Sequence, residues 1–317
     1  MKISFLRRLT WAKHQTHRKA QRLPAAWQGM WWMALGGLMF SLLNTIARAI
    51  ALEMDPFQTQ FLRYLFGLLV MLPFVWRAGF KAYWPKDMKG QFWRGGVHTL
   101  GLMLWFIALP RIPLADMTAI GFTGPIFIMI GAGLFLGESM HRDRWVASLI
   151  GFAGVLVVVL PKLSGEGGWY HLVMLASAPV FAASFLITKA LTRYENAGVI
   201  VLWQALTVTL LSFPLALPHW QDPSAWQWVG FFVAGILGTT GHYCLTRAFA
   251  MADISATQSL RFLDLVWASI MGWLVFADVP SQSTWLGALV ILMATVWIAR
   301  REGRRPVKQT NPKTPAT

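Results

Sequence analysis

Long runs of apolar residues, separated by short polar stretches, account for most of the chain. A helix needs about 20 mostly apolar residues to cross the roughly 30 Å hydrocarbon core of a membrane. Ten runs reach or approach that length, and they extend approximately over residues 30–51, 57–76, 95–111, 114–136, 144–161, 169–190, 198–217, 226–249, 255–277 and 283–300. The connections between them are too short to hold a soluble domain. The pattern therefore predicts an all-α membrane protein with ten transmembrane helices.

The first five runs resemble the last five. A shift of 140 residues places identical residues in register, namely Gly90 with Gly230, Gly95 with Gly235, Thr99 with Thr239, Gly101 with Gly241, Ala108 with Ala248, Phe122 with Phe262 and Trp145 with Trp285. Upstream, a shift of 141 pairs Met33 with Met174, Phe40 with Phe181 and Pro73 with Pro214. Because each repeat has an odd number of spans, the second must enter the membrane upside down, an arrangement typical of transporters. We predict two inverted five-helix repeats, at 30–161 and 169–300, between a basic N-terminal tail (1–29) and a C-terminal tail (301–317).

The distribution of positive charge supports this inversion. Residues 77–94 carry five Lys or Arg, whereas the corresponding residues 217–228 carry none. Lys and Arg are concentrated in cytoplasmic loops, so residues 77–94 and the basic N-terminus are expected on the cytoplasmic side. An even number of spans then returns the C-terminus to the same side. We expect a multi-pass protein of the bacterial cell inner membrane with both termini cytoplasmic.

The composition agrees with a membrane protein. The chain is 56% hydrophobic and 13% charged, with a mean hydropathy of +0.50, which is too apolar for a soluble domain. A net charge of +15 would suggest nucleic acid in a soluble chain, but here the basic residues lie at span ends and in the tails. There they suit the charged surface of a lipid bilayer, so no nucleic-acid partner is expected.

The sequence lacks the motifs of a catalytic or ATP-driven protein. No phosphate-binding loop, nucleophile elbow, paired zinc-ligand histidines or dinucleotide fingerprint occurs in it. Cys244 is the only cysteine, which excludes an intrachain disulfide and a multi-cysteine metal site. We therefore expect neither an enzyme nor a cofactor or metal.

Two arginines inside predicted spans are candidates for substrate binding. Arg48 and Arg63 lie at similar depths near the outer surface, and a buried charge is costly unless it faces a cavity or a partner. Together they could hold an anionic or carboxylate-bearing substrate in a fork of guanidinium groups. Alternatively, they reach the outer headgroups or pair with Glu53, Asp55 or Asp116.

Arg261 and Asp264 form a second charged pair. They are three residues apart in the ninth span and therefore share one helical face. The pair could merely neutralise itself. Alternatively, Asp264 near the membrane midplane takes up a proton or another coupling ion, or meets a cationic group of the substrate, with Arg261 tuning its pKa.

Aromatic and histidine side chains within the spans are further candidates. His242 and its neighbour Tyr243 could contact a substrate, whereas a lone histidine near a span end, such as His98, more often has a structural role. Three deep tryptophans could stack on a planar ligand or simply fill the core. They are Trp105, Trp203 and Trp267.

Two prolines interrupt predicted spans. Pro125 lies in the fourth span and Pro179 in the sixth. A proline removes a backbone hydrogen bond and permits a kink. In a transporter such a break can serve as a hinge or expose backbone groups to the substrate, although proline kinks also occur without either role.

Several segments together resemble one known family. They are Phe61-Leu-Arg63-Tyr-Leu-Phe-Gly-Leu-Leu, Leu104-Trp105-Phe106-Ile-Ala108-Leu109, Pro113-Leu-Ala115, Phe135-Leu-Gly137-Glu138, Leu245-Thr-Arg247-Ala248 and Leu265-Val-Trp267-Ala. This set resembles the EamA branch of the drug/metabolite transporter superfamily over about residues 30–301. The resemblance implies ten helices in two inverted repeats, cytoplasmic termini and secondary transport of metabolites. Arg63 and Arg247 match basic positions that are common in the family.

We therefore predict a secondary active transporter that moves a small polar or zwitterionic metabolite by alternating access. Amino acids, amines, S-adenosylmethionine and vitamin-like compounds fit this class. A proton-coupled exporter of aromatic or lipophilic compounds is the alternative, and an intramembrane lipid-modifying enzyme is a more distant one. The substrate, the direction of transport, the coupling ion and the choice between monomer and homodimer stay open.

Overall fold

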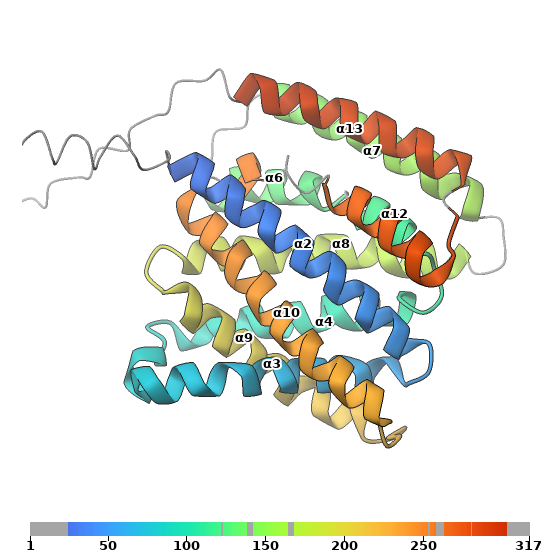
Figure 1. The fold of residues 1–317 in the computed structure, drawn as a ribbon. Helices are drawn as coiled ribbons and strands as arrows, with labels where there is room; N and C mark the ends of the chain where they lie inside the picture. The colour runs from blue at the N-terminus through green and yellow to red at the C-terminus, as the bar shows by residue number, and fades with distance from the viewer. Residues whose placement is uncertain are drawn as a thin grey trace, which may run out of the picture.

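The computed structural model describes residues 25–121, 123–137, 142–163, 168–252, 254–257, 263–279 and 281–302. Within these ranges every regular element is helical, so the predicted all-α class is confirmed (Figure 1). The first half contains α2 (Ala25–Ala51), α3 (Pro56–Ala78), η1 (Phe80–Tyr83), α4 (Met88–Ala108), α5 (Leu114–Gly121), α6 (Gly124–Phe135) and α7 (Arg142–Leu163). The second contains α8 (Gly168–Leu191), α9 (Ala197–Ala216), α10 (Ala225–Met251), α11 (Ile254–Thr257), α12 (Leu263–Phe276) and α13 (Gln282–Glu302).

Five helices in the described part of the chain are long and apolar enough to cross a membrane. They are α2, α3, α8, α9 and α10. Shorter apolar helices include α6 and parts of α12 and α13. Each of the five overlaps one run that the apolar pattern predicts as a span and extends beyond it by at least one residue.

Polar caps, rather than apolar runs, decide where some helices begin. Helix α4 starts at Met88 and not at residue 95, because the Asp87 side chain accepts a hydrogen bond from the backbone N–H of Gly90 (2.9 Å). At α3, Asp55 caps the N–H groups of Phe57 and Gln58 in the same way. Such a cap satisfies donors of the first helical turn, so the helix extends beyond its apolar part.

The fourth predicted span is divided into two shorter helices, and the ninth contains two described helical segments. The fourth consists of α5 and α6, with Pro125 in the first turn of α6. The ninth includes α11 and α12. Under the shift of 140 residues, Gly124 at the start of α6 corresponds to Asp264 in the first turn of α12.

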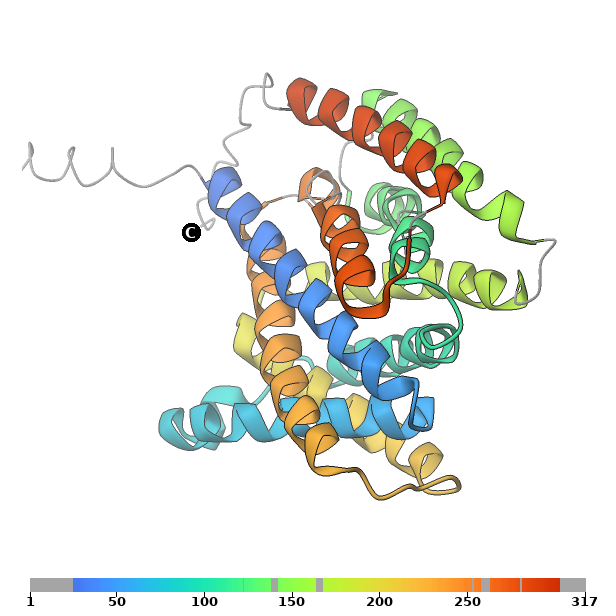
Figure 2. The same ribbon diagram turned by 45° about the vertical axis from the view of Figure 1, so that its right-hand side comes forward.

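The packing of the helices is nearly unchanged when the two halves are exchanged. Helix α2 packs on α10 as α4 packs on α8, and α3 packs on α10 as α9 packs on α4. Helices α7 and α13 pack on one another and lie side by side along one edge of the molecule (Figures 1 and 2). This pattern is expected of two repeats related by a two-fold axis.

Glycines at equivalent positions allow these helices to approach closely. A Cβ atom at Gly95 would lie 2.4 Å from Thr207, and one at Gly235 would lie 2.7 Å from the backbone of Phe66. Because residues 66 and 207 also correspond under the shift of 141, both contacts follow the register read from the sequence. Small residues at helix crossings are a common means of close packing in membranes.

Candidate functional site

A cavity of about 180 Å³ lies where the two halves meet. Its lining comes from α2, α3, α4, α5 and α6 of the first half and from α8, α10 and α12 of the second. The paired helices α7 and α13 contribute none of its described lining residues. Transporters built from repeats bind their substrates at such an interface.

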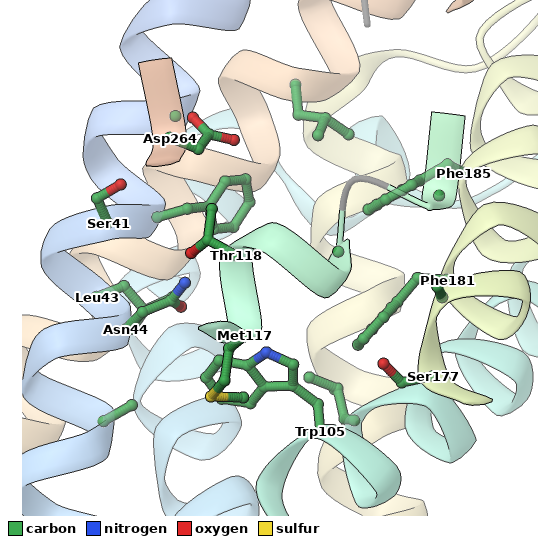
Figure 3. Close-up of a pocket in the computed structure, with 18 of the residues that line it drawn as sticks. Ser41, Leu43, Asn44, Trp105, Met117, Thr118, Ser177, Phe181, Phe185 and Asp264 are labelled. Atoms are coloured by element: carbon green, nitrogen blue, oxygen red, sulfur yellow. The ribbon is translucent and has the colours of Figure 1, made fainter. Parts of the chain in front are cut away.

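One side of the cavity is polar. Ser41 and Asn44 reach it from α2, Thr118 from α5 and Asp264 from α12 (Figure 3). The Asp264 carboxylate packs tightly on α2, since a Cβ atom at Gly37 would lie 2.2 Å from its Oδ1.

The other side is aromatic. Phe181 and Phe185, one turn apart on α8, present rings that are nearly parallel, with an interplanar angle of 18° and centroids 6.3 Å apart. Trp105 of α4 lies next to Met117 at one end of the cavity (Figure 3). Rings arranged in this way offer faces on which a flat ligand can stack.

A buried hydrogen-bond network lies beside the cavity, between α3, α4, α9 and α10. The Tyr64 hydroxyl lies 3.0 Å from Nε2 of His98 and 3.3 Å from Nε2 of His242. Nδ1 of His98 lies 3.0 Å from Oγ of Ser184 on α8. The Gln204 amide nitrogen lies 3.5 Å from the Tyr64 hydroxyl and 3.4 Å from Nε2 of His242. The network joins both halves of the molecule.

Arg94 donates a hydrogen bond to Gln204 of this network and two more to neighbouring groups. Its guanidinium donates to Oε1 of Gln204 (2.6 Å), to the carbonyl of Ile200 (3.0 Å) and to the hydroxyl of Thr188. The side chain is only 1% exposed, so a buried cation is satisfied entirely by neutral acceptors among the described residues. Because Arg94 occupies Oε1, the amide nitrogen of Gln204 must point toward Tyr64 and His242.

Arg63 lies beside the network and lines the cavity. Its Cζ atom is 4.0 Å from the centre of the Tyr64 ring, a cation–π contact. The guanidinium occupies space left by Gly238, where a Cβ atom would be 2.7 Å from Nη2.

Four of the predicted binding residues line this cavity. They are Arg63, Trp105, His242 and Asp264. Four others are not among its described lining residues, namely Arg48, Trp203, Tyr243 and Trp267. Arg261 lies outside the residues that the structure describes.

Arg48 does not join Arg63 in a fork. It forms an ion pair with Asp278, and its Cζ atom lies 4.5 Å from the centre of the Phe276 ring. Its acidic partner is therefore none of the three carboxylates expected from the sequence. Asp278 follows α12 and is distant in sequence, and periodicity along one helix gives no information about such a contact.

The remaining aromatic candidates have packing contacts. The Trp203 indole N–H donates to the carbonyl of Tyr83 (2.9 Å), and its ring packs edge-on against Trp84. Tyr243 lies edge-on to Trp32, with centroids 6.0 Å apart.

The two prolines differ in their surroundings. Pro125 lies in the first turn of α6, where a proline fits without loss of a helical hydrogen bond. Pro179 lies inside α8, which continues through it from Gly168 to Leu191. The sixth span is thus not interrupted at Pro179, because the residues on both sides keep the helix.

Several cavity residues were not predicted. Ser41 and Asn44 were missed, although with Gly37 they form a small and polar stripe at helical spacing along α2. Four further lining residues were not predicted to bind substrate, namely Tyr64, Thr118, Phe181 and Phe185. His98, for which a structural role is expected, indeed has hydrogen-bond partners on both ring nitrogens.

Comparisons with known proteins agree with a repeated membrane fold. Residues 27–160 and 168–300 each match the EamA-like transporter family. A riboflavin transporter of Rhizobium johnstonii is 35% identical over 283 residues, covering 88% of this chain and 93% of that protein. A riboflavin transporter of Vibrio cholerae is 31% identical over 289 residues, covering 90% and 97%. An S-adenosylmethionine uptake transporter of Rickettsia felis is 28% identical over 274 residues, covering 86% and 93%. One solved crystal structure superposes with a TM-score of 0.67 at 17% identity, covering 85% of this chain and 98% of the other, which shows a shared fold.

Proposed function

Because the chain belongs to the EamA-like transporter family, we propose that it carries riboflavin, or a closely related flat vitamin, across the membrane. Family membership itself makes the chain a multi-pass membrane transporter of small metabolites and not an enzyme. The family resemblance found in the sequence is thereby confirmed, and the distant alternative of a lipid-modifying enzyme is removed.

The observation that carries the proposal is the two-sided cavity. Riboflavin combines a flat tricyclic ring with a flexible chain of hydroxyl groups, and it has no net charge. The ring matches the near-parallel faces of Phe181 and Phe185 with Trp105 nearby, and the hydroxyls match Ser41 and Asn44 on the opposite side. The two relatives named as riboflavin transporters support the same substrate.

S-adenosylmethionine is the second candidate substrate, and Asp264 is the observation that favours it. This compound also has a flat ring, but it carries a positive sulfonium and an ammonium group. A carboxylate on the cavity wall suits such cations. The relative named as an S-adenosylmethionine uptake transporter supports this alternative.

For the mechanism we propose ten spans in two inverted repeats that alternate access to the cavity. The exchange symmetry of the helix pairs and the close contacts at Gly95 and Gly235 support this arrangement. The charge distribution supports cytoplasmic termini in a bacterial inner membrane. In a background without Cys244, single cysteines at Lys86 and Gln221 should react with an impermeant reagent from opposite sides. Labelling of both from outside intact cells would contradict the inverted topology.

Counterflow in liposomes tests the substrate. Purified protein is reconstituted into vesicles loaded with unlabelled riboflavin or S-adenosylmethionine, and uptake of the matching labelled compound is followed. We expect transient accumulation of labelled riboflavin. Counterflow of S-adenosylmethionine alone would replace the first candidate by the second, and counterflow of neither would reject both.

A further inference from the structure

Two buried hydrogen-bond donors of the cavity wall have no partner in the part of the chain that the structure describes. They are Nη1 of Arg63 and Nδ1 of His242. Both side chains line the cavity, and both are only 6% exposed. Buried polar groups are nearly always hydrogen-bonded in folded proteins, so two orphans on one cavity wall suggest partners supplied by a ligand.

The network fixes which nitrogen of His242 carries the proton. Arg94 can only donate, so it requires Oε1 of Gln204 as an acceptor and leaves the Gln204 amide to donate. That amide nitrogen and the Tyr64 hydroxyl both face Nε2 of His242, at 3.4 and 3.3 Å. Nε2 is therefore the acceptor. The proton of a neutral His242 ring lies on Nδ1, which becomes a donor without a partner.

The charged and titratable groups around this point also favour an acceptor. Arg63 and Arg94 are cations, and Tyr64 and His98 face His242 from α3 and α4. Among the described residues, none of the hydrogen bonds within this group of side chains involves a carboxylate. An ammonium or sulfonium group would be repelled here, whereas a carbonyl or carboxylate oxygen would be attracted.

The two donors adjoin the aromatic side of the cavity. The His242 ring lies 5.3 Å from the His98 ring, and the His98 ring lies 5.3 Å from the Phe181 ring, measured between centroids. A flat ligand stacked on Phe181 would thus bring one of its edges toward His242 and Arg63.

We propose that Arg63 Nη1 and His242 Nδ1 form a two-donor subsite that binds the acceptor edge of a flat substrate. For a flavin, this edge is the dioxopyrimidine ring with its two carbonyl groups, and the hydroxyl chain then extends toward Ser41 and Asn44. Both side chains line the cavity, so a ligand bound there lies against them. The inference rests on the proposed function and adds the orientation of the substrate.

Gly238 is a positioning residue of this subsite. A Cβ atom there would lie 2.7 Å from Nη2 of Arg63, so Gly238→Ala displaces the guanidinium without removing its charge. Gly96 on α4 provides the matched control, because a Cβ atom at Gly96 meets nothing within 4 Å. Tyr243→Phe is the control for His242→Phe, since Tyr243 is adjacent in sequence but is not among the described lining residues.

The test compares two flat probes on the purified full-length protein by calorimetry. Lumichrome keeps the dioxopyrimidine ring of riboflavin and lacks the hydroxyl chain, whereas 6,7-dimethylquinoxaline is flat and lacks the carbonyl-bearing ring. We expect the wild type to bind lumichrome at least about tenfold more tightly than the quinoxaline. His242→Phe and Gly238→Ala should abolish this preference while quinoxaline binding persists, which also reports that each variant is folded. The two controls should keep the preference.

The outcomes separate this inference from the proposed function. Absence of a lumichrome preference in the wild type, or a preference that survives in both variants, overturns the subsite. If His242→Phe fails to fold, Gly238→Ala gives the decision alone. Loss of riboflavin counterflow together with an intact, variant-sensitive lumichrome preference rejects riboflavin as the substrate and leaves the subsite standing.

Discussion

The two long sides of the cavity are built from equivalent positions of the two repeats, yet their chemistry differs at two of these positions. Under the shift of 141, Asn44 on α2 corresponds to Phe185 on α8, and Ser41 corresponds to Ala182. The same backbone position thus provides an amide on one side and an aromatic ring on the other. A ligand with a polar and an aromatic part has one favoured orientation between such walls.

The packing contacts around the cavity, by contrast, have kept the symmetry. A Cβ atom at Gly101 would lie 3.0 Å from the Phe181 ring, and one at Gly241 would lie 3.2 Å from the Phe40 ring. Gly101 corresponds to Gly241 under the shift of 140, and Phe40 corresponds to Phe181 under the shift of 141. Helix packing therefore constrains both repeats alike at Phe40 and Phe181, which also line the cavity, whereas the lining positions of Asn44 and Phe185 differ.

The largest expected effect comes from Asp264, the carboxylate on the polar side of the cavity. Asp264→Asn should abolish uphill accumulation in liposomes with an imposed pH gradient, while counterflow persists, because a neutral amide cannot exchange a proton between the two sides. Asp222→Asn, at an exposed loop position, is the matched control. Accumulation with normal pH dependence in Asp264→Asn would remove Asp264 as the coupling group.

The aromatic side of the cavity, formed by Phe181 and Phe185 with Trp105 nearby, should account for most of the substrate affinity. Stacking of an aromatic side chain on a heterocyclic ring contributes about 1–3 kcal/mol, or roughly 5- to 150-fold in Kd. Phe185→Leu keeps an apolar side chain but loses the ring face, so riboflavin binding measured by calorimetry should weaken to this extent. Phe92→Leu, whose ring packs on Trp203 away from the described cavity lining, should bind normally. Equal losses in both variants would argue against stacking.

The ion pair between Arg48 and Asp278 belongs to neither side of the described cavity lining, so its loss should affect stability alone. Arg48→Ala leaves Asp278 without the partner seen here, so we expect the apparent Tm to fall by a few degrees. Replacement of both residues by leucine should recover most of this loss. Riboflavin Kd should stay unchanged in either variant, and a weakened Kd in Arg48→Ala would return Arg48 to the binding site.

The repeat and the helical class were readable from the sequence because they depend on spacing along the chain. Apolar runs of span length and identical residues at a fixed shift, such as Gly95 with Gly235, need no knowledge of tertiary contacts. Helix starts depend on single polar side chains such as Asp87, which lie outside the apolar run. This is why α4 begins earlier than its apolar pattern predicts.

The cavity was only partly predictable, because the sequence does not reveal which helix faces another. Arg63 and Asp264 attract notice as charges in apolar spans, and both line the cavity. Phe181 and Phe185 have no such mark, since a phenylalanine in a transmembrane helix is as suitable for lipid as for ligand. Arg48 attracts notice for the same reason but is not among the described lining residues, because its charge is paired with Asp278, more than 200 residues away in sequence.

The smallest expected effect distinguishes two tryptophans that look alike in the sequence. Trp105 lines the cavity, whereas the Trp203 indole N–H donates to the carbonyl of Tyr83 beside α9. Trp203→Phe loses one hydrogen bond, worth about 1 kcal/mol, so the apparent Tm should fall slightly and riboflavin Kd should change by less than about twofold. Trp105→Phe should do the reverse, weakening binding with little change in Tm. If Trp203→Phe weakened binding as much as Trp105→Phe, the aromatic side of the cavity would have to extend to α9.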